Sequence, residues 1–234
     1  MAHSATSSSR RGPFRFVDDL LRARRDLAPD AEGLPWVGIL SVIVVCGFGY
    51  GFTMGAWGLG TFGFRPKQAL FSGLKVPILL TLAPFVCLPN FFVVNTVLGL
   101  RDDFATACRG VLASQAVVAA TLLALAPVTA TGYASVADYA TAVAINGAQF
   151  LVASVAGQIA LARYYRRLIA RDRRHRAARN AWLVLYVFVA IQLAWVLRPF
   201  VGAPTIRTSF FRQEAWSNAY VVVAEVVVSV VTGK

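Results

Sequence analysis

The chain has 234 residues, of which 57% are hydrophobic and only 15% are charged, and its formal net charge is +12. Soluble domains carry about 25% charged residues, so this composition excludes most soluble proteins and predicts an all-α protein with several membrane spans. Twenty of the 23 basic residues are arginines, and fourteen of the 23 lie in two clusters that flank apolar stretches. This positive-inside distribution indicates membrane topology and contact with anionic lipid rather than nucleic-acid binding.

The region before the first apolar stretch divides into two parts. Residues 1–12 are rich in Ser, Ala and Arg, and we expect them to form a disordered tail. In residues 13–33, Val17 and Leu20 recur at helical spacing, which predicts a short amphipathic helix on the membrane surface. Docking of this helix on loops of the protein itself is the alternative. The remaining residues, 34–234, form the predicted transmembrane domain.

Six apolar segments in this domain are about long enough to cross a bilayer as helices. With the N-terminus in the cytoplasm, both arginine clusters face the cytoplasm, as the positive-inside rule requires. Loop 59–75 then faces the opposite side, although it contains Arg65, Lys67 and Lys75. If the last segment does not cross, five spans remain. The predicted spans are 36–58, 76–100, 110–131, 138–162, 181–197 and 217–232.

Three glycines at intervals of four residues, Gly47, Gly51 and Gly55, form a doubled GxxxG stripe on the first predicted span. Because glycine has no side chain, a second backbone can approach this helix face closely. We expect the stripe to pack against a neighbouring span of the same chain. Packing against a second copy of the protein and the approach of a ligand to the bare backbone are the alternatives.

The second predicted span contains two internal prolines, Pro84 and Pro89. Each proline removes a backbone hydrogen bond and clashes with the preceding turn, which predicts a kinked or broken helix. Asn90 and Asn95 follow at once. Carbonyl groups freed beside Asn side chains resemble the polar midplane sites of transporters. The alternative is a kinked packing helix whose Asn side chains bond to neighbouring spans.

Further polar side chains interrupt the apolar spans. Asn146 and Gln149 are three residues apart and share one helix face. Glu225 is the only acidic residue well inside a predicted span, and an ionisable group in that position is by default a functional candidate. Arg198, at the end of the fifth span, is its candidate partner. The candidate polar path, or alternatively an interhelical hydrogen-bond network, consists of Asn90, Asn95, Asn146, Gln149, Gln192, Arg198 and Glu225.

The densest basic stretch, residues 163–179, contains eight arginines. We expect it to extend the fourth spanning helix into the cytoplasm, with Tyr164 and Tyr165 at the membrane interface. Clustered arginines near a membrane attract anionic headgroups at about 1 kcal/mol per charge, and an acidic protein partner is the alternative. The residues expected to make these contacts are Arg163, Arg166, Arg167, Arg171, Arg173 and Arg174.

The sequence contains no pattern that indicates enzymatic chemistry. Its two histidines, His3 in the tail and His175 in the basic loop, lie outside the predicted spans, and its three cysteines are scattered. This excludes haem ligation by two histidines within the spans and provides no disulfide framework. Asp102 and Asp103 are adjacent, but a metal bound there would lack further ligands. We therefore predict no catalytic residues, no metal site and no cofactor.

Four motifs carry a resemblance to known proteins: residues 75–80 (KVPILL), 88–95 (LPNFFVVN), 98–104 (LGLRDDF) and 197–202 (LRPFVG). With these motifs the chain resembles a group of uncharacterised bacterial multi-pass membrane proteins. The resemblance implies a place in the bacterial cytoplasmic membrane and carries no function. A looser similarity, of topology only, links the chain to Yip1-type membrane proteins, which have a cytoplasmic N-terminus and about five spans.

Two functions remain open at this point. The first is a non-enzymatic accessory, scaffold or membrane-organising subunit that works through helix packing and basic surfaces, as a homo-oligomer or with another membrane protein. The second is a small transporter or channel with a polar path beside the proline-containing second span. We predict the first, because polar side chains within spans most often form hydrogen bonds between helices.

Overall fold

The computed structural model describes residues 13–22, 36–58, 63, 65–135, 138–202 and 208–211. No strand occurs in these ranges, and five helices, α2 to α6, are long and apolar enough to span a membrane. The prediction of an all-α polytopic bundle is confirmed. The expected tail, the sixth segment and Glu225 lie outside the described residues. The elements are α1 (Pro13–Arg22), α2 (Trp36–Gly55), α3 (Pro66–Val97), the 3-10 helix η2 (Arg101–Asp103), α4 (Phe104–Ser135), α5 (Tyr139–Arg171) and α6 (Arg174–Leu197).

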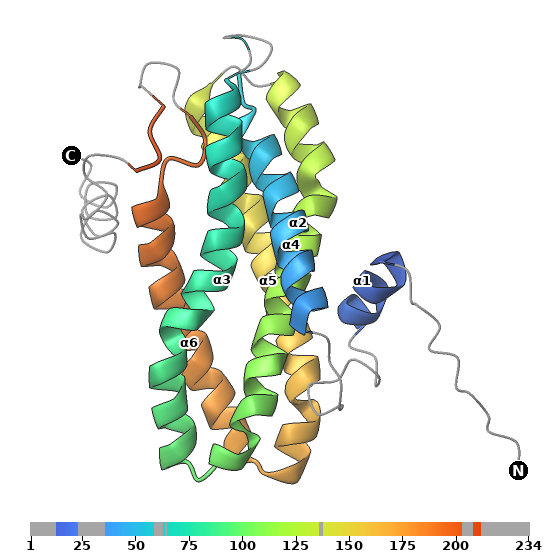
Figure 1. The fold of residues 1–234 in the computed structure, drawn as a ribbon, viewed down its shortest axis with the longest axis vertical. Helices are drawn as coiled ribbons and strands as arrows, with labels where there is room; N and C mark the ends of the chain where they lie inside the picture. Colours follow the sequence, from blue (N-terminus) through green and yellow to red (C-terminus); the bar gives the residue numbers. More distant parts are fainter. Residues whose placement is uncertain are drawn as a thin grey trace, which may run out of the picture.

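The five long helices run alternately up and down, because short connections join each helix to the next (Figure 1). One end of the bundle is formed by residues 98–103 and 163–179, and we call it the arginine-rich end. The opposite end is formed by residues 56–58, 138–139 and 198–202, where the rings of Trp57 and Tyr139 lie 5.6 Å apart. The connection between α3 and α4, which contains Arg101, therefore lies at the same end of the molecule as the turn between α5 and α6.

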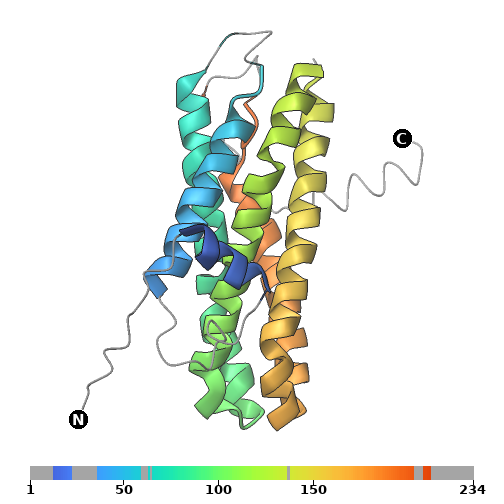
Figure 2. The same ribbon diagram turned by 90° about the vertical axis from the view of Figure 1, so that its right-hand side faces the viewer.

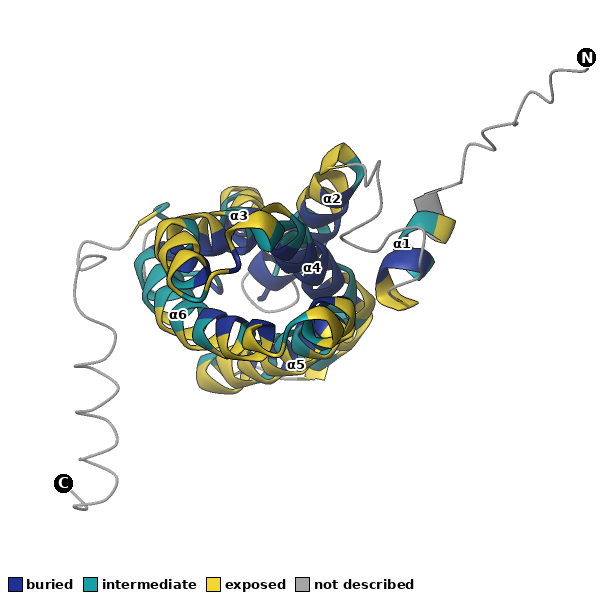
Figure 3. Ribbon diagram, turned by 90° about the horizontal axis from the view of Figure 1, so that it is seen from below, coloured by how far each residue is buried: buried dark blue, intermediate teal, exposed yellow. Residues whose placement is uncertain are grey.

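Helix α4 lies between α2 and α5 and carries much of the core (Figure 3). Its buried face is rich in alanine, including Ala113, Ala116 and Ala119. On α5, a Cβ added at Gly157 would clash with Val118 of α4. Such small residues let helices approach closely where the lipid supplies no hydrophobic drive for association. Helix α6 packs mainly on α3 and only slightly on α5, so the contact between α5 and α6 is the loosest one around the bundle.

The predicted loop 59–75 is wrong over its second half, because α3 begins at Pro66, ten residues before the predicted span. Proline is favoured in the first helical turn, because the backbone N–H groups of that turn have no acceptor within the helix and the missing N–H of proline costs no hydrogen bond. Arg65, Lys67 and Gln68 lower the mean hydropathy around the start of α3. A search for apolar runs therefore places the start of this helix too late in the sequence. Lys75, expected in a loop, lies within α3 and is fully buried.

Helix α3 is also continuous through its internal prolines, including Pro84 and Pro89. Of the two expected outcomes, a kinked or a broken helix, the break does not occur. A proline costs one backbone hydrogen bond, and a helix held by neighbours tolerates that loss. Helix α3 packs against α2 and α6, and Pro84 itself is buried while Pro89 is exposed.

The glycine stripe of α2 packs against α3 within the same chain. Gly51 faces the carbonyl group of Ser72, and Gly55 faces Ala69. Gly47 lies against the backbone of Pro77, where an added Cβ would be 3.3 Å from the proline nitrogen. The face that could have served a second copy of the protein is thus covered by α3.

We expect Gly51→Ala to destabilise the protein by about 1–3 kcal/mol, the range for overpacked cores. A Cβ at Gly51 would lie 2.9 Å from the Ser72 carbonyl carbon, and its oxygen is closer still. Backbone cannot move aside as a side-chain tip can, so α2 and α3 must separate. Thermal unfolding in detergent measures the effect. Gly132→Ala is the control, because a Cβ added there would lie 3.4 Å from the nearest atom, which belongs to the side chain of Ile145. Equal melting temperatures for the two variants would contradict the close contact between α2 and α3.

Helix α1 packs on the side of the bundle, next to the start of α2 (Figure 2). Leu20 is buried, and its carbonyl oxygen accepts a hydrogen bond from the Tyr164 hydroxyl at 2.9 Å. The Arg163 guanidinium donates to the Leu21 carbonyl oxygen at 3.3 Å. Helix α1 covers residues 13–22 of the expected amphipathic helix 13–33, whose other residues lie outside the described ranges, and its apolar side contacts the spanning helices.

Asp138 precedes α5 and caps it: the carboxylate accepts hydrogen bonds from the Thr141 backbone N–H and hydroxyl, both at 2.8 Å. These bonds, the backbone one foremost, lower the pKa of Asp138 below its ordinary value of 3.8. Because the pKa is lower in the folded protein, the ionised Asp138 carboxylate stabilises the fold at pH values above its ordinary pKa. This stabilisation is lost as the pH falls through the lowered pKa.

On acidification from about pH 7 to pH 3 we expect the wild type to lose more thermal stability than Asp138→Asn, since Asn caps helices without titrating. Parallel pH profiles would contradict this.

Candidate functional site

The arginine-rich end presents a stiff basic surface that is built on α5. In the last turns of this helix, Leu161, Tyr164, Tyr165 and Leu168 are buried on one face. The arginines occupy the remaining positions, and seven of the eight in residues 163–179 are exposed. This separation follows from the helical period, which places residues three and four apart on one side. Helix α5 continues through the first half of the basic stretch and ends at Arg171. The second half begins α6 at Arg174, so the expectation that the whole stretch extends the spanning helix is wrong there.

The turn between α5 and α6 is held by Asp172 and Arg174. The Arg174 backbone N–H donates to Asp172 Oδ1 at 2.8 Å, and the guanidinium Nε lies 3.3 Å from Oδ2. Arg174 Nη1 also donates to the Leu98 carbonyl oxygen at 3.0 Å. Gly99, with φ of +73°, provides the left-handed residue that the facing turn needs. Arg174, expected to contact lipid, thus joins the two turns of this end.

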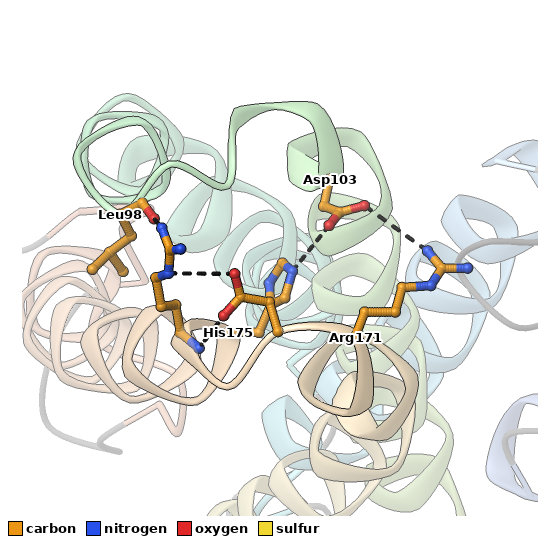
Figure 4. Close-up of polar contacts among 6 residues, drawn as sticks. Leu98, Asp103, Arg171 and His175 are labelled. Carbon is orange, nitrogen blue, oxygen red and sulfur yellow. Dashed lines mark hydrogen bonds and ion pairs between the residues drawn. The ribbon is translucent and has the colours of Figure 1, made fainter.

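His175 lies in α6 and is fully buried, so its expected place in a basic loop is wrong. Its Nε2 lies 3.0 Å from Asp103 Oδ2, and Arg171 Nη1 lies 4.0 Å from Asp103 Oδ1 (Figure 4). Asp103, considered from the sequence only as a metal ligand, thereby connects η2 with α5 and α6. Within the described ranges, no group of three or more His, Cys, Asp or Glu residues is placed to hold a metal ion.

Positive charge dominates the surface of this end. Residues 101–103 and 163–179 contain nine arginines but only three aspartates, two of which make the ion pairs described above. A guanidinium presents five donors in a planar fork that matches the oxygens of a phosphate or carboxylate. Several arginines are therefore oriented toward whatever surrounds this end of the bundle. The exposed arginines of this end also include Arg166, Arg167, Arg173 and Arg176.

Asn146 and Gln149 belong to a buried polar cluster that joins three helices. The Tyr50 hydroxyl of α2 lies 3.0 Å from Asn146 Oδ1 and 2.8 Å from Gln149 Oε1. The Thr129 hydroxyl of α4 donates to the same Gln149 oxygen at 2.6 Å, and Asn146 Nδ2 donates to the Tyr133 hydroxyl at 2.5 Å. Such bonds act as contacts between helices. Sequence reasoning missed Tyr50, Thr129 and Tyr133, because hydroxyl groups do not interrupt an apolar pattern.

The other candidate polar residues are dispersed. Asn95 is buried toward the arginine-rich end, where its Nδ2 donates to the Phe91 carbonyl oxygen at 2.8 Å. Asn90 is exposed, because an offset of five positions from Asn95 rotates it by roughly 140° around the helix. Gln192 is half-buried on α6, and the Arg198 guanidinium lies 3.3 Å from the centre of the Trp195 ring. Of the described members, Asn146 and Arg198 line one cavity between α5 and α6, whereas Asn90, Asn95, Gln149 and Gln192 do not line it.

A polar stripe that sequence reasoning missed lies buried on α3. Gln68, Ser72 and Lys75 are spaced by four and three residues and so share one helix face. Gln68 Nε2 donates to the Phe200 carbonyl oxygen at 3.1 Å, and the Ser72 hydroxyl donates to the same oxygen. Lys75 Nζ donates to the Pro199 carbonyl oxygen at 2.7 Å. The segment after α6 is thereby held against α3, which explains how polar residues are buried near the end of a spanning helix.

Comparison with known proteins finds no matching family model, no matching curated protein and no matching solved structure. The function is therefore inferred from the geometry of the chain itself. Its most distinctive feature is the exposed arginine surface on a well-packed end of the bundle.

Proposed function

We propose that the protein is a non-enzymatic membrane protein that acts as an accessory or membrane-organising subunit and binds anionic lipid headgroups at its arginine-rich end. The observation that carries this proposal is the exposure of seven of the eight arginines in residues 163–179. Arg163, Arg166, Arg167 and Arg171 belong to α5, and the other arginines follow in the turn and the first turns of α6. Both helices are long and apolar enough to span a membrane, which supports a position at the depth of the headgroups. A basic residue near an anionic membrane surface contributes about 1 kcal/mol of attraction.

The charge distribution also supports an orientation. The arginine-rich end is the more basic end of the described bundle, and the positive-inside rule assigns such an end to the cytoplasm. We therefore propose that the arginine-rich end faces the cytoplasm, in the bacterial cytoplasmic membrane that the sequence resemblance implies. Homo-oligomers or a second membrane protein are partners through which such a subunit would act.

Transport finds less support in the geometry. A transporter or channel gathers polar residues around a water-filled cavity. Here Asn146 and Gln149 bond to Tyr50 on a neighbouring helix, while Asn90 is exposed on the outer side of α3. Of the described candidates, only Asn146 and Arg198 line the cavity of about 920 Å³ between α5 and α6, which favours the accessory role over the transporter.

Native mass spectrometry of the purified protein tests the proposed lipid contact. The detergent-solubilised protein is titrated with phosphatidylglycerol or phosphatidylcholine of the same acyl chains. We expect adducts of the anionic lipid to form at lower concentration and to weaken as the ionic strength rises, because salt screens exposed charges. Equal binding of the two lipids would refute the proposal.

A further inference from the structure

The cavity of about 920 Å³ between α5 and α6 opens toward the side of the bundle. It exists because α6 packs on α3 and touches α5 only slightly. Leu151 and Val155 of α5 and Val187 and Ile191 of α6 line the cavity, and all four are exposed. The outer sides of both helices are exposed as well (Figure 3). In a membrane these sides face the bilayer, so an acyl chain can enter the cavity sideways.

The lining of the cavity suits an apolar occupant. Its inner wall includes Leu80 of α3 and Val118 of α4. Two of its polar side chains bond to protein: the Tyr186 hydroxyl donates to Gln115 Oε1 at 2.9 Å, and Asn146 belongs to the buried polar cluster described above. The other polar side chains of the lining are Tyr139, Ser154, Gln158 and Arg198. Because a buried water needs two to four polar partners, a mainly apolar lining favours an acyl chain over a water-filled path.

The half of the cavity nearest the arginine-rich end has the depth of one lipid leaflet. The lining of α5 from Leu151 to Ala162 is roughly 17 Å long at 1.5 Å per residue, and half of the hydrocarbon core is about 15 Å. Ala162 lies nine residues before the end of α5 at Arg171, and Leu183 lies nine residues after the start of α6 at Arg174. The two walls therefore begin at the same depth, and the chain of a lipid whose headgroup lies at the arginine-rich end reaches along this half.

Arginines continue both lining faces beyond the cavity. On α5, Arg166 follows Ile159 by seven residues, and on α6, Arg179 precedes Tyr186 by seven residues. Seven residues are close to two helical turns, so each arginine lies on the same side of its helix as the lining. Arg166 lies five residues before the end of α5, and Arg179 lies five residues after the start of α6. Both are thus at one depth, roughly 6 Å beyond Ala162.

We propose that one anionic phospholipid binds here, with an acyl chain in the cavity between α5 and α6 and its phosphate between Arg166 and Arg179. The chain gains van der Waals contact with the cavity walls, since lipid surroundings supply no hydrophobic drive. The planar guanidinium groups match the phosphate oxygens in shape and charge. This inference rests on the proposed binding of anionic headgroups and adds to it a single site that recognises both the chain and the phosphate.

Native mass spectrometry of the full chain in detergent, titrated with phosphatidylglycerol, tests the position of the acyl chain. Ser154 lines the cavity, so the ring of Ser154→Trp occupies part of it. We expect this variant to weaken the first lipid adduct at least tenfold. The matched control is Val152→Trp, because Val152 is exposed on the same helix and does not line the cavity. It is expected to bind the lipid as the wild type does.

The possible outcomes separate this inference from the proposed function. If Ser154→Trp is folded by size-exclusion chromatography and binds phosphatidylglycerol as tightly as the wild type, the cavity holds no acyl chain and this inference fails. Equal weakening by Val152→Trp has the same consequence. In both cases a preference of the wild type for phosphatidylglycerol over phosphatidylcholine still supports the proposed function, whereas loss of that preference refutes it. Ala190→Trp, on the facing wall, replaces Ser154→Trp if the latter does not fold.

A charge-matched comparison tests the phosphate contact. Arg166→Gln combined with Arg179→Gln removes the two arginines beside the cavity. Arg167→Gln combined with Arg173→Gln removes two charges from the same end, but Arg167 is turned by about 100° from Arg166 and Arg173 precedes the first turn of α6. We expect the first pair to weaken the first phosphatidylglycerol adduct at least tenfold more than the second, because direct hydrogen bonds to phosphate add to the general attraction. Equal weakening by the two pairs would overturn the phosphate site.

Discussion

Replacement of Arg166, Arg167, Arg173 and Arg176 by Gln is expected to weaken the binding of anionic lipid about a thousandfold. Each of these arginines is exposed at the arginine-rich end, and each contributes about 1 kcal/mol near an anionic surface. Four such contributions amount to about 4 kcal/mol, which corresponds to that factor in the binding constant. Native mass spectrometry with phosphatidylglycerol gives the binding constants of both proteins.

The matched control replaces the same four arginines by Lys. Lysine keeps the charge but lacks the planar fork that binds phosphate with two hydrogen bonds. We expect this variant to retain most of the affinity, since long-range attraction depends on charge. If the Gln variant binds anionic lipid as tightly as the wild type, headgroup binding does not occur at this surface and the proposed function fails.

Trp182→Ala is expected to destabilise the protein by about 3–5 kcal/mol, the usual cost of removing a large aromatic side chain from a core. Trp182 is fully buried in α6. Its ring lies 4.9 Å from that of Phe91 on α3 and 5.8 Å from that of Tyr186. It therefore fills the space where α6 meets α3, beneath the arginine surface. Equilibrium unfolding in mixed detergent measures the change in the free energy of unfolding.

Phe188→Ala on the same helix is the control for this prediction. Phe188 is 57% exposed, so lipid or detergent occupies the vacated space and the expected loss is well below that of Trp182→Ala. Because a loosened α6 no longer supports the turn that carries Asp172 and Arg174, we also expect Trp182→Ala to weaken lipid binding. If Trp182→Ala lowers the free energy of unfolding by less than about 1 kcal/mol, the contact between Trp182 and Phe91 does not hold α6 in place.

The sequence by itself determined the class of the protein and most of its spans. Long apolar runs with few charges can satisfy their backbone groups in lipid only as helices, so the positions of α2, α4, α5 and α6 follow from composition within a few turns. The arginine surface could also be predicted from the sequence, because charged residues beside an apolar span lie at the membrane boundary however the helices pack. The glycine stripe on α2 likewise indicated a close helix contact before its partner was known.

Only the tertiary structure decided which polar residues meet. Lys75 was assigned to a loop because its charge interrupts an apolar run, whereas its acceptor, the Pro199 carbonyl oxygen, lies 124 residues further along the chain. The sequence places His175 in the basic loop, whereas Asp103 on another element holds it in the core. Asn146 and Gln149 were identified from one helix, while their partner Tyr50 was not. Hydropathy is a property of each segment alone, whereas the burial of a polar group depends on a partner that only the folding of distant segments brings within hydrogen-bonding distance.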